Sequence, residues 1–257
     1  MKTGVISLAM ENSFRCALLE NGQIQCWWED RDRQTGAFID LSSRILEKVP
    51  PAKQLSVGNR GGCATTEQGE AWCWSYDSLR HEVGRPAKVE GLEKVVKVVN
   101  GRNHSCALSE HGQVFCWGDG PSFDRWGRMV ETEHAVPTPT KVRGLDGAVD
   151  LALGRKSVCA TSRSGELTCI GAINGPPNAL LLGELSPTSF AVDHDIANLS
   201  LGDHHGCFID EEEMVRCFGD NSFGQLGDGT TTRRQKIANL VKGLGKAATV
   251  ACTGDQS

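Results

Sequence analysis

The stretch Cys106-Ala-Leu-Ser-Glu-His-Gly-Gln-Val-Phe-Cys-Trp117 decides the fold, because its plan recurs along the chain of 257 residues. A near copy is Cys16-Ala-Leu-Leu-Glu-Asn-Gly-Gln-Ile-Gln-Cys-Trp27. Five cysteine pairs share this internal spacing: Cys16/Cys26, Cys63/Cys73, Cys106/Cys116, Cys159/Cys169 and Cys207/Cys217. The first cysteines of successive pairs lie 47, 43, 53 and 48 residues apart. A period of this length indicates an array of similar units.

Each copy of the motif predicts a β-hairpin, in which two short apolar strands flank a polar turn. Six residues after the first cysteine stands a glycine that can adopt a positive φ: Gly22, Gly69, Gly112 or Gly165. Folding about this turn places the two cysteines opposite each other, within reach of a disulfide. The alternative is a pair of buried reduced thiols that pack as small apolar side chains. In the fifth unit Glu213 replaces the glycine, which predicts a strained or differently shaped turn.

An apolar or β-branched run precedes most of the hairpins and predicts a further strand. These runs are Gln54–Val57, Val95–Val99, Val149–Leu153 and Ile196–Leu201. Each is followed by a glycine five residues before the next cysteine: Gly58, Gly101, Gly154 and Gly202. A strand, a loop, a hairpin and a variable connection in every period suit the blades of a propeller. The approximate units are 1–48, 49–91, 92–144, 145–192 and 193–244, with 245–257 starting a sixth.

The fifth unit carries the most specific motif, Cys217-Phe-Gly-Asp-Asn-Ser-Phe-Gly-Gln-Leu-Gly-Asp-Gly-Thr230. Together with His104–Leu108 and Cys116–Gly118, it resembles the repeat of the regulator of chromosome condensation (RCC1) family, over essentially the whole chain. The paired cysteines are similar to bacterial members of that family, which are described as alpha-tubulin-suppressor-like proteins.

The resemblance implies an all-β fold, an RCC1-like β-propeller that typically has seven blades. Since five hairpins are present, we expect residues 1–257 to form a single propeller domain of about five blades. Two forms remain open: a partial or open arc, and a small closed ring.

Composition and charge narrow the function classes. The formal net charge of −5 and the lack of a long basic run argue against nucleic acid as a partner. No segment approaches the roughly 20 apolar residues that cross a membrane. Disulfides favour an extracellular or periplasmic location if an upstream signal is missing, and a complete chain would be cytoplasmic.

No cofactor, metal or catalytic site is expected. Nine residues separate the cysteines of each pair, unlike the short spacings of zinc sites. The pair His204-His205 beside Asp203 is an acid–base candidate, but a solvated loop with one ring packed against the blade is the preferred explanation. Without a nucleophile elbow or a phosphate-binding loop, the sequence predicts a protein that is not an enzyme.

Candidate partner-binding residues lie in the loops before the hairpins. Arg60, Arg102, Arg155 and Lys156 occupy equivalent loops, so the repeat places them on one face. Trp28, Trp72 and Trp126 break the repeat pattern. They are either exposed anchors for a partner, for which Trp28 and Trp126 are the candidates, or the result of unequal packing among the blades. The predicted function is a non-enzymatic protein-binding scaffold, whose partner is another protein. The alternative, implied by the resemblance, is guanine-nucleotide exchange on a small GTPase.

Overall fold

The computed structural model describes residues 4–11, 14–31, 35, 37–77, 80, 82–101, 104–118, 121–123, 129–131, 136–155, 157–171, 188–190, 192, 196–232 and 235–252. These residues form strands, turns and irregular segments, and none of them lies in a helix. Two compact units, Met1–Glu110 and His111–Ser257, meet in the turn of the third hairpin. The all-β prediction is confirmed, and the prediction of one single domain stays a prediction.

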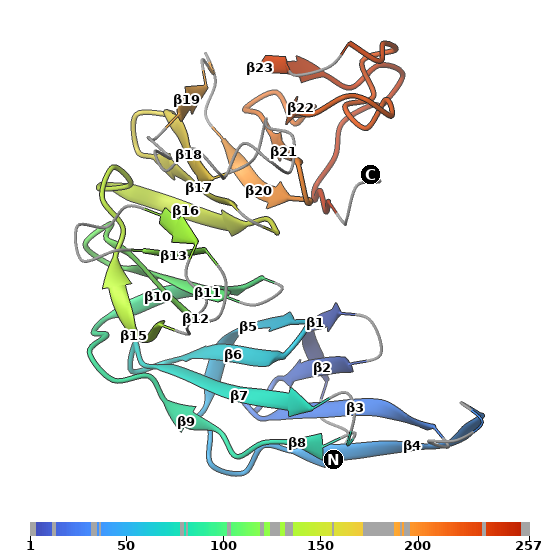
Figure 1. Cartoon of the computed structure of the whole chain (residues 1–257), viewed down its shortest axis with the longest axis vertical. Helices are drawn as coiled ribbons and strands as arrows, with labels where there is room; N and C mark the ends of the chain where they lie inside the picture. The colour runs from blue at the N-terminus through green and yellow to red at the C-terminus, as the bar shows by residue number, and fades with distance from the viewer. Residues whose placement is uncertain are drawn as a thin grey trace. The chain divides into compact units, whose positions relative to one another are not determined.

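The first unit contains the strands β1 to β11 (Figure 1). The first sheet has the order β1 (Val5–Glu11), β2 (Phe14–Leu19), β3 (Ile24–Arg31), β4 (Phe38–Ile45). The second has the order β5 (Ala52–Gly58), β6 (Gly61–Thr66), β7 (Ala71–Asp77), β8 (Glu82–Val83), with β9 (Ala87–Lys88) also paired to β7. The third sheet begins with the antiparallel pair β10 (Val95–Asn100) and β11 (His104–Ser109).

The second unit continues the same plan. The third sheet, of order β10-β11-β12-β15, has its other two strands here: β12 (Val114–Gly118) and β15 (Val136–Lys141). A two-stranded ribbon joins β13 (Pro121–Phe123) and β14 (Met129–Glu131). The fourth sheet is β16 (Ala148–Leu153), β17 (Ser157–Ser162), β18 (Leu167–Gly171), β19 (Thr188–Phe190). The fifth is β20 (Ala197–Leu201), β21 (His205–Ile209), β22 (Val215–Gly219), β23 (Gln235–Leu240). Each predicted repeat unit therefore holds the strands of one large sheet, and the unit 92–144 holds the ribbon as well.

The paired cysteines join the two central strands of each sheet. Cys16 lies directly opposite Cys26, and Cys207 opposite Cys217, with Cα atoms 4.0 and 4.1 Å apart. The pairs Cys63–Cys73 and Cys159–Cys169 repeat this geometry, and Cys106 and Cys116 are also disulfide-bonded. The disulfide prediction is confirmed for the repeat. The remaining cysteine, Cys252, is a buried free thiol whose pKa is raised to about 11 by burial.

The hairpin turns adopt the predicted left-handed conformation at the sixth position. Gly22, Gly69, Gly112 and Gly165 have φ between 73° and 79°. Glu213 has a φ of 65° and its N–H bonds the Asp210 carbonyl at 3.0 Å, as Gly22 N–H bonds Leu19. The expectation of a differently shaped turn was therefore wrong, because the hairpin imposes its geometry on glutamate. The expectation of strain fits the left-handed conformation, which costs a side chain with a Cβ about 1–2 kcal/mol.

We predict that Glu213→Gly raises the free energy of unfolding by about 0.5–1 kcal/mol, because the relief of strain exceeds the entropy that glycine loses on folding. The lost ion pair with Lys246 contributes little, since both side chains are largely exposed. Urea denaturation measures the change. Glu212→Gly is the matched control, because Glu212 has a negative φ, and it should lower stability. A lower stability of Glu213→Gly would contradict the assignment of strain.

The core of the first unit lies between neighbouring sheets. One face of the first sheet contributes Phe14, Leu18 and the cystine Cys16–Cys26, which pack against Leu55 and Trp74 of the second sheet. The rings of Phe14 and Tyr76 stack with centroids 4.3 Å apart. Polar side chains join the second and third sheets, because Gln54 exchanges two hydrogen bonds with the backbone of Val98, at 2.9 and 3.0 Å. Apolar packing thus joins the first and second sheets, and amide hydrogen bonds to the backbone join the second and third.

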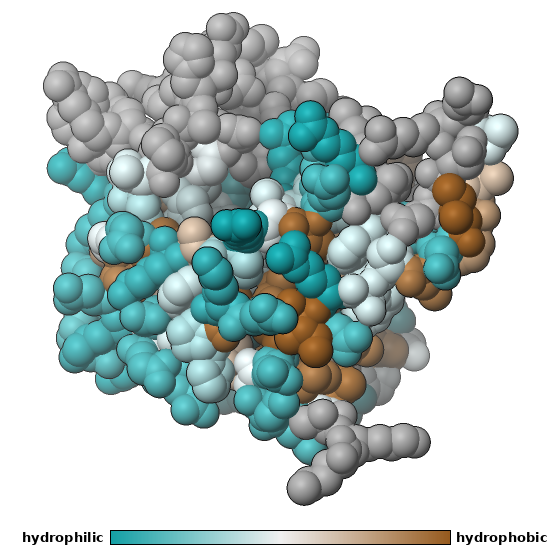
Figure 2. Space-filling model, turned by 90° about the horizontal axis from the view of Figure 1, so that it is seen from below, coloured by the Kyte–Doolittle hydropathy of each residue, from teal (hydrophilic) through white to brown (hydrophobic). Residues whose placement is uncertain are grey.

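The strands β1 and β4 carry the largest group of exposed apolar side chains in the described residues. Leu8 and Met10 of β1 and Leu41 of β4 are each more than half exposed. Leu55 and Val57 stand at the equivalent positions of the second sheet and are buried against the first sheet. Figure 2 shows hydrophobic patches within a mostly hydrophilic surface.

In the second unit the segment that follows β23 covers the cystine of the fifth sheet. Val250 and Cys252 pack with Cys207, Cys217 and Leu226. The N–H of Cys252 donates to the Ser200 hydroxyl at 2.9 Å. This segment contains no assigned strand within its described residues, although the repeat aligns it with the first strand of a unit.

Candidate partner-binding site

The structure describes two of the four cationic residues that the sequence predicted at the partner-binding loops. Arg60 lies in the loop between β5 and β6 and is exposed. Arg155, between β16 and β17, forms an ion pair with Asp203 at 3.6 Å and is 43% exposed. Arg102, Lys156 and Trp126 lie outside the described residues. Since Arg60 and Arg155 belong to different units, the predicted common face stays a prediction.

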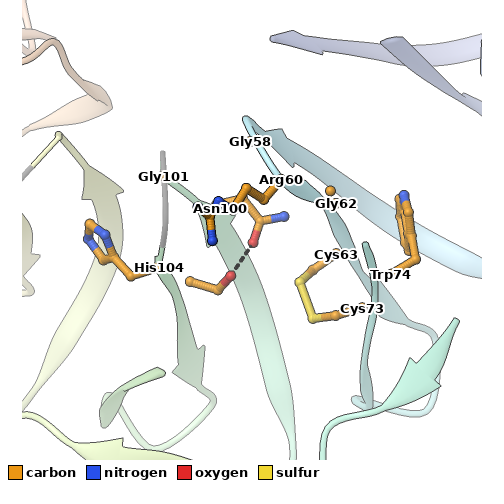
Figure 3. A pocket seen from close by; sticks show the side chains of 11 residues that line it. Gly58, Arg60, Gly62, Cys63, Cys73, Trp74, Asn100, Gly101 and His104 are labelled. Atoms are coloured by element: carbon orange, nitrogen blue, oxygen red, sulfur yellow. Dashed lines mark hydrogen bonds between the residues drawn. A yellow bond between two sulfur atoms is a disulfide. The ribbon is translucent and has the colours of Figure 1, made fainter. Parts of the chain in front are cut away.

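A pocket of about 100 Å³ opens beside Arg60, within the first unit. Its walls come from the segment 58–63, from Cys73 and Trp74 of β7, and from Asn100, Gly101, His104 and Ser105. Figure 3 draws Arg60 and Asn100 in the middle of this site, with Trp74 and the Cys63–Cys73 disulfide on one side and Gly101 and His104 on the other. The repeat thus brings two consecutive pre-hairpin loops to one hollow.

Glycine backbone forms much of the pocket wall. A Cβ on Gly58 would lie 2.2 Å from the carbonyl oxygen of Gly101. A Cβ on Gly61, whose φ is 144°, would lie 2.0 Å from the carbonyl oxygen of Trp74. Both contacts are shorter than any real Cβ makes, so the close approach of the loops requires glycine there.

Asn100 fixes the position of one loop against the other. Its backbone N–H donates to the Ser56 hydroxyl and its side-chain amide donates to the Ser56 carbonyl, both at 2.9 Å. Its side-chain oxygen accepts from the Ser105 hydroxyl at 2.6 Å. These hydrogen bonds fix the Asn100 side chain in the absence of a ligand, so this part of the pocket is preformed.

Two buried side chains of the pocket wall carry polar atoms without a hydrogen-bond partner in the described structure: Trp74 Nε1 and both ring nitrogens of His104. Each side chain is 5% exposed. Burial lowers the pKa of His104 to about 4, so the imidazole is neutral near pH 7. The His104 ring points away from the other labelled residues in Figure 3, and Arg60 is the positively charged side chain among the described lining residues.

Trp28 corrects the prediction of an exposed anchor. It is 8% exposed and lies 6.2 Å from the Tyr76 ring, centroid to centroid. Tyr76 belongs to the next sheet, so the packing between sheets covers a tryptophan that departs from the repeat. Trp72, the other irregular tryptophan, is half-buried and donates to Glu70 at 2.9 Å.

A second pocket, of about 150 Å³, lies within the second unit. Asp146 and Glu166 are among its lining residues, and Ser189 donates to Glu166 at 2.7 Å. Sequence analysis did not find it, because its walls come from a turn, a hairpin and β19, which share no motif.

The described residues contain no group of three or more His, Cys, Asp or Glu side chains able to hold a metal ion. His205 is the first residue of β21 and is buried, and His204 lies in the bend before it. The expectation that the protein is not an enzyme stays a prediction. No helix among the described residues is long and apolar enough to span a membrane.

The loop that carries the specific motif of the fifth repeat has a structural role. Asn221 is fully buried, and its amide donates to Asp228 Oδ1 and to the Thr230 carbonyl, both at 3.1 Å. Its side-chain oxygen accepts from the Leu226 N–H at 3.0 Å. The motif Cys217–Thr230 therefore builds a closed loop rather than an open binding site.

Tandem antiparallel sheets of four or five strands, one from each sequence repeat, define a β-propeller repeat protein. The model of the regulator of chromosome condensation (RCC1) repeat matches two segments of the chain, residues 95–122 and 196–225. The propeller prediction is confirmed by the solved structures. Yeast RCC1 (Prp20), solved bound to Kap60, superposes with a TM-score of 0.77 at 20% identity, over 97% of this chain and 66% of that chain. Human WBSCR16 gives 0.78 at 16% identity, over 98% and 71%.

Curated relatives match over much of this chain but over little of their own. The human E3 ubiquitin-protein ligase HERC2 is 27% identical over 263 residues, which cover 94% of this chain and 5% of HERC2. The human probable E3 ubiquitin-protein ligase HERC6 is 29% identical over 182 residues, 67% of this chain and 17% of HERC6. The chain therefore spans a small part of these relatives.

Proposed function

We propose that this protein is a non-enzymatic scaffold that binds another protein through its pre-hairpin loops. The observation that carries the proposal is the preformed pocket beside the exposed Arg60, held by two glycine-rich loops on rigid sheets. Loops that a rigid repeat scaffold positions are common binding surfaces. The similarity of the paired cysteines to bacterial members of the RCC1 family stays a prediction and does not enter this argument.

Site-directed photo-crosslinking tests the scaffold. A photoreactive amino acid in place of Asn59, next to Arg60, should capture a defined protein from an extract of the native source. The same amino acid in place of Glu90, an exposed residue in the turn after β9, is the matched control. Capture at residue 59 that Arg60→Gln abolishes supports the proposal. Equal capture at both positions, or none at residue 59, contradicts it.

The alternative function is guanine-nucleotide exchange on a small GTPase. The observation that favours it is the fold of the yeast protein Prp20p, whose structure was described with its binding properties to Gsp1p and histones; it superposes with a TM-score of 0.73 at 20% identity. Release of a fluorescent guanine nucleotide from a panel of small GTPases tests this activity. A flat response across the panel removes the alternative.

A further inference from the structure

We propose that two copies of this chain associate through the outer edge of β4, which pairs antiparallel with β4 of the second copy about a two-fold axis. The inference goes beyond the proposed partner-binding loops and does not depend on them. The lining of the Arg60 pocket, as far as it is described, includes no residue of β4.

The backbone of β4 presents free pairing groups on its outer side. One edge of β4 pairs with β3, and no strand of the described residues pairs with the other edge (Figure 1). The Leu46 N–H donates to the Ile24 carbonyl at 2.9 Å, and the direction of the backbone groups alternates along a strand. The N–H and C=O groups of Leu41, Ser43 and Ile45 therefore point away from β3. A row of such groups is a template for pairing with another strand.

The outer strands of the other large sheets have features that discourage such pairing, and β4 has fewer of them. β15 contains Pro139 and Lys141, β23 contains Lys236, and β8, β9 and β19 are two or three residues long. β4 has eight residues and neither proline nor lysine. Its register with β3 shifts at Ile39, which leaves the regular stretch 40–45 as the edge available for a second strand.

The side chains along this edge also favour association. Phe38, Ile39 and Leu41 are between 57% and 62% exposed, and Ile45 is 41% exposed. A second copy on the same edge removes part of this apolar surface from water, which is favourable. The β4 edge therefore combines unused backbone groups with apolar side chains that have no cover in the described structure.

The charges of β4 select one register of the pair. When Ser42 lies opposite Ser42 of the second copy, Asp40 lies opposite Arg44 of that copy, and Arg44 opposite its Asp40. Opposite charges placed directly across an antiparallel pair stabilise it, and the two-fold axis forms this pair twice. Shifting the register by one step in either direction, to an axis through Leu41 or Ser43, forms neither ion pair.

Both charged side chains have partners in the single chain that are compatible with this pairing. Asp40 accepts from the Leu41 N–H at 2.7 Å, and Arg44 donates to the Val83 carbonyl at 3.1 Å. In the pair, the Leu41 N–H donates to the Ser43 carbonyl of the second copy, which releases the Asp40 carboxylate. The guanidinium of Arg44 has five N–H donors, so it can bind this carboxylate and keep Val83.

The other edge strand of the first sheet, β1, lacks this complementarity. Its one charged side chain is Glu11, so two β1 strands gain no ion pair in any register. Pairing through β1 is therefore the competing outcome that the experiments below distinguish.

Analytical ultracentrifugation of the full chain over a range of concentrations tests the dimer. Asp40→Arg and Arg44→Asp each place like charges opposite each other twice, so each should raise the dissociation constant about tenfold. The double variant Asp40→Arg/Arg44→Asp restores opposite charges and should recover most of the affinity. Asp146→Arg makes the same change of charge at an aspartate of the second unit that is 59% exposed, and should change nothing.

Disulfide trapping tests the register. In a Cys252→Ala background, Ser42→Cys places two cysteines opposite each other on the axis. Their Cα atoms should be about 4.5 Å apart, within reach of a disulfide. Ser43→Cys is the matched control, because the two copies of residue 43 are diagonal neighbours, about 7–8 Å apart and too distant to bond. Mild oxidation followed by non-reducing gel electrophoresis should show a covalent dimer for Ser42→Cys alone.

Several outcomes overturn the inference. These are a monomer at every concentration, or a dimer that neither single charge variant weakens. A covalent dimer of Ser43→Cys in place of Ser42→Cys would contradict the ion-paired register. A dimer that resists both charge variants and is not trapped by Ser42→Cys belongs to another surface, such as β1. Urea midpoints close to that of the wild type show that each variant is folded.

Discussion

Reduction of the disulfides is expected to lower the free energy of unfolding more than any single substitution. Each cystine closes a short loop, since its two cysteines are 10 residues apart. In the chain-entropy model a loop of this length contributes roughly 2–3 kcal/mol. Five such loops contribute on the order of 10 kcal/mol, which is comparable to the whole stability of a typical domain. The urea midpoint with and without a phosphine reductant measures the effect.

A single-pair variant and a free-thiol variant control this experiment. Cys159→Ala/Cys169→Ala should lower stability by about 2–3 kcal/mol from the loss of one loop, with a further cost from the truncated buried side chains. Cys252→Ala removes the free cysteine and should leave the response to reductant unchanged. If all thiols become titratable while the urea midpoint stays in place, the cystines do not stabilise the fold.

Loss of the Asp210 charge is expected to be the most damaging single substitution. The Asp210 carboxylate is fully buried, accepts from the Arg216 side chain at 2.6 Å and from the N–H groups of Glu212 and Met214 at 3.0 and 2.9 Å. The Arg216 side chain is 22% exposed, so the pair is only partly buried, and loss of a hydrogen bond between charged groups costs about 1.5–3 kcal/mol. We expect Asp210→Asn to lie at the low end of that range, because the amide oxygen still accepts from the backbone. Chemical denaturation at neutral pH measures the cost.

The pH dependence of this stability loss distinguishes the contribution of the Asp210 charge from that of its packing. Burial raises the pKa of Asp210, but the hydrogen bonds from Met214, Arg216 and Glu212 and the charge of Arg216 outweigh it, so the pKa in the folded protein is lowered. A lowered pKa gives stability that is present above the unfolded-state pKa of about 3.9 and is lost as the pH falls through the folded value. The difference between wild type and Asp210→Asn should be constant from pH 5 to 7 and shrink below about pH 4.

Asp146→Asn is the matched control for this experiment. Asp146 pairs with Lys141 at 2.7 Å, but the aspartate is 59% exposed, and exposed ion pairs contribute little. Its loss should leave the urea midpoint nearly unchanged at every pH. An Asp210→Asn difference that persists unchanged at low pH would show that the side chain acts through packing and not through its charge.

The repeat predicted what a short stretch of chain determines by itself. Cross-strand cysteines and left-handed turns follow from the spacing of Cys16, Gly22 and Cys26, because the hairpin is a local structure. Glu213 shows the limit of that inference: the hairpin keeps its turn even without glycine, with Asp210 accepting from the loop backbone. The equivalent Thr66 accepts from Glu70 in the same way, a signal that an alignment of the repeats contains.

The candidate site depends on contacts between neighbouring repeats, which no single repeat contains. Trp28 is buried because Tyr76 of the following sheet covers it. The Arg60 pocket exists because residues 58 and 101 approach closely, 43 positions apart in the chain, and their distance is decided by packing between sheets. Sequence patterns identified Arg60 as a candidate, but only the folded unit shows the hollow beside it.

The local cystines also simplify oxidative folding. Ten cysteines can pair in on the order of a thousand ways, and most of those pairings would cross-link different units. Here each native partner lies 10 residues away, so the entropy of loop closure favours the native bond over distant competitors. Each sheet can therefore acquire its own cross-link as soon as its hairpin has been synthesised, without waiting for the rest of the polypeptide.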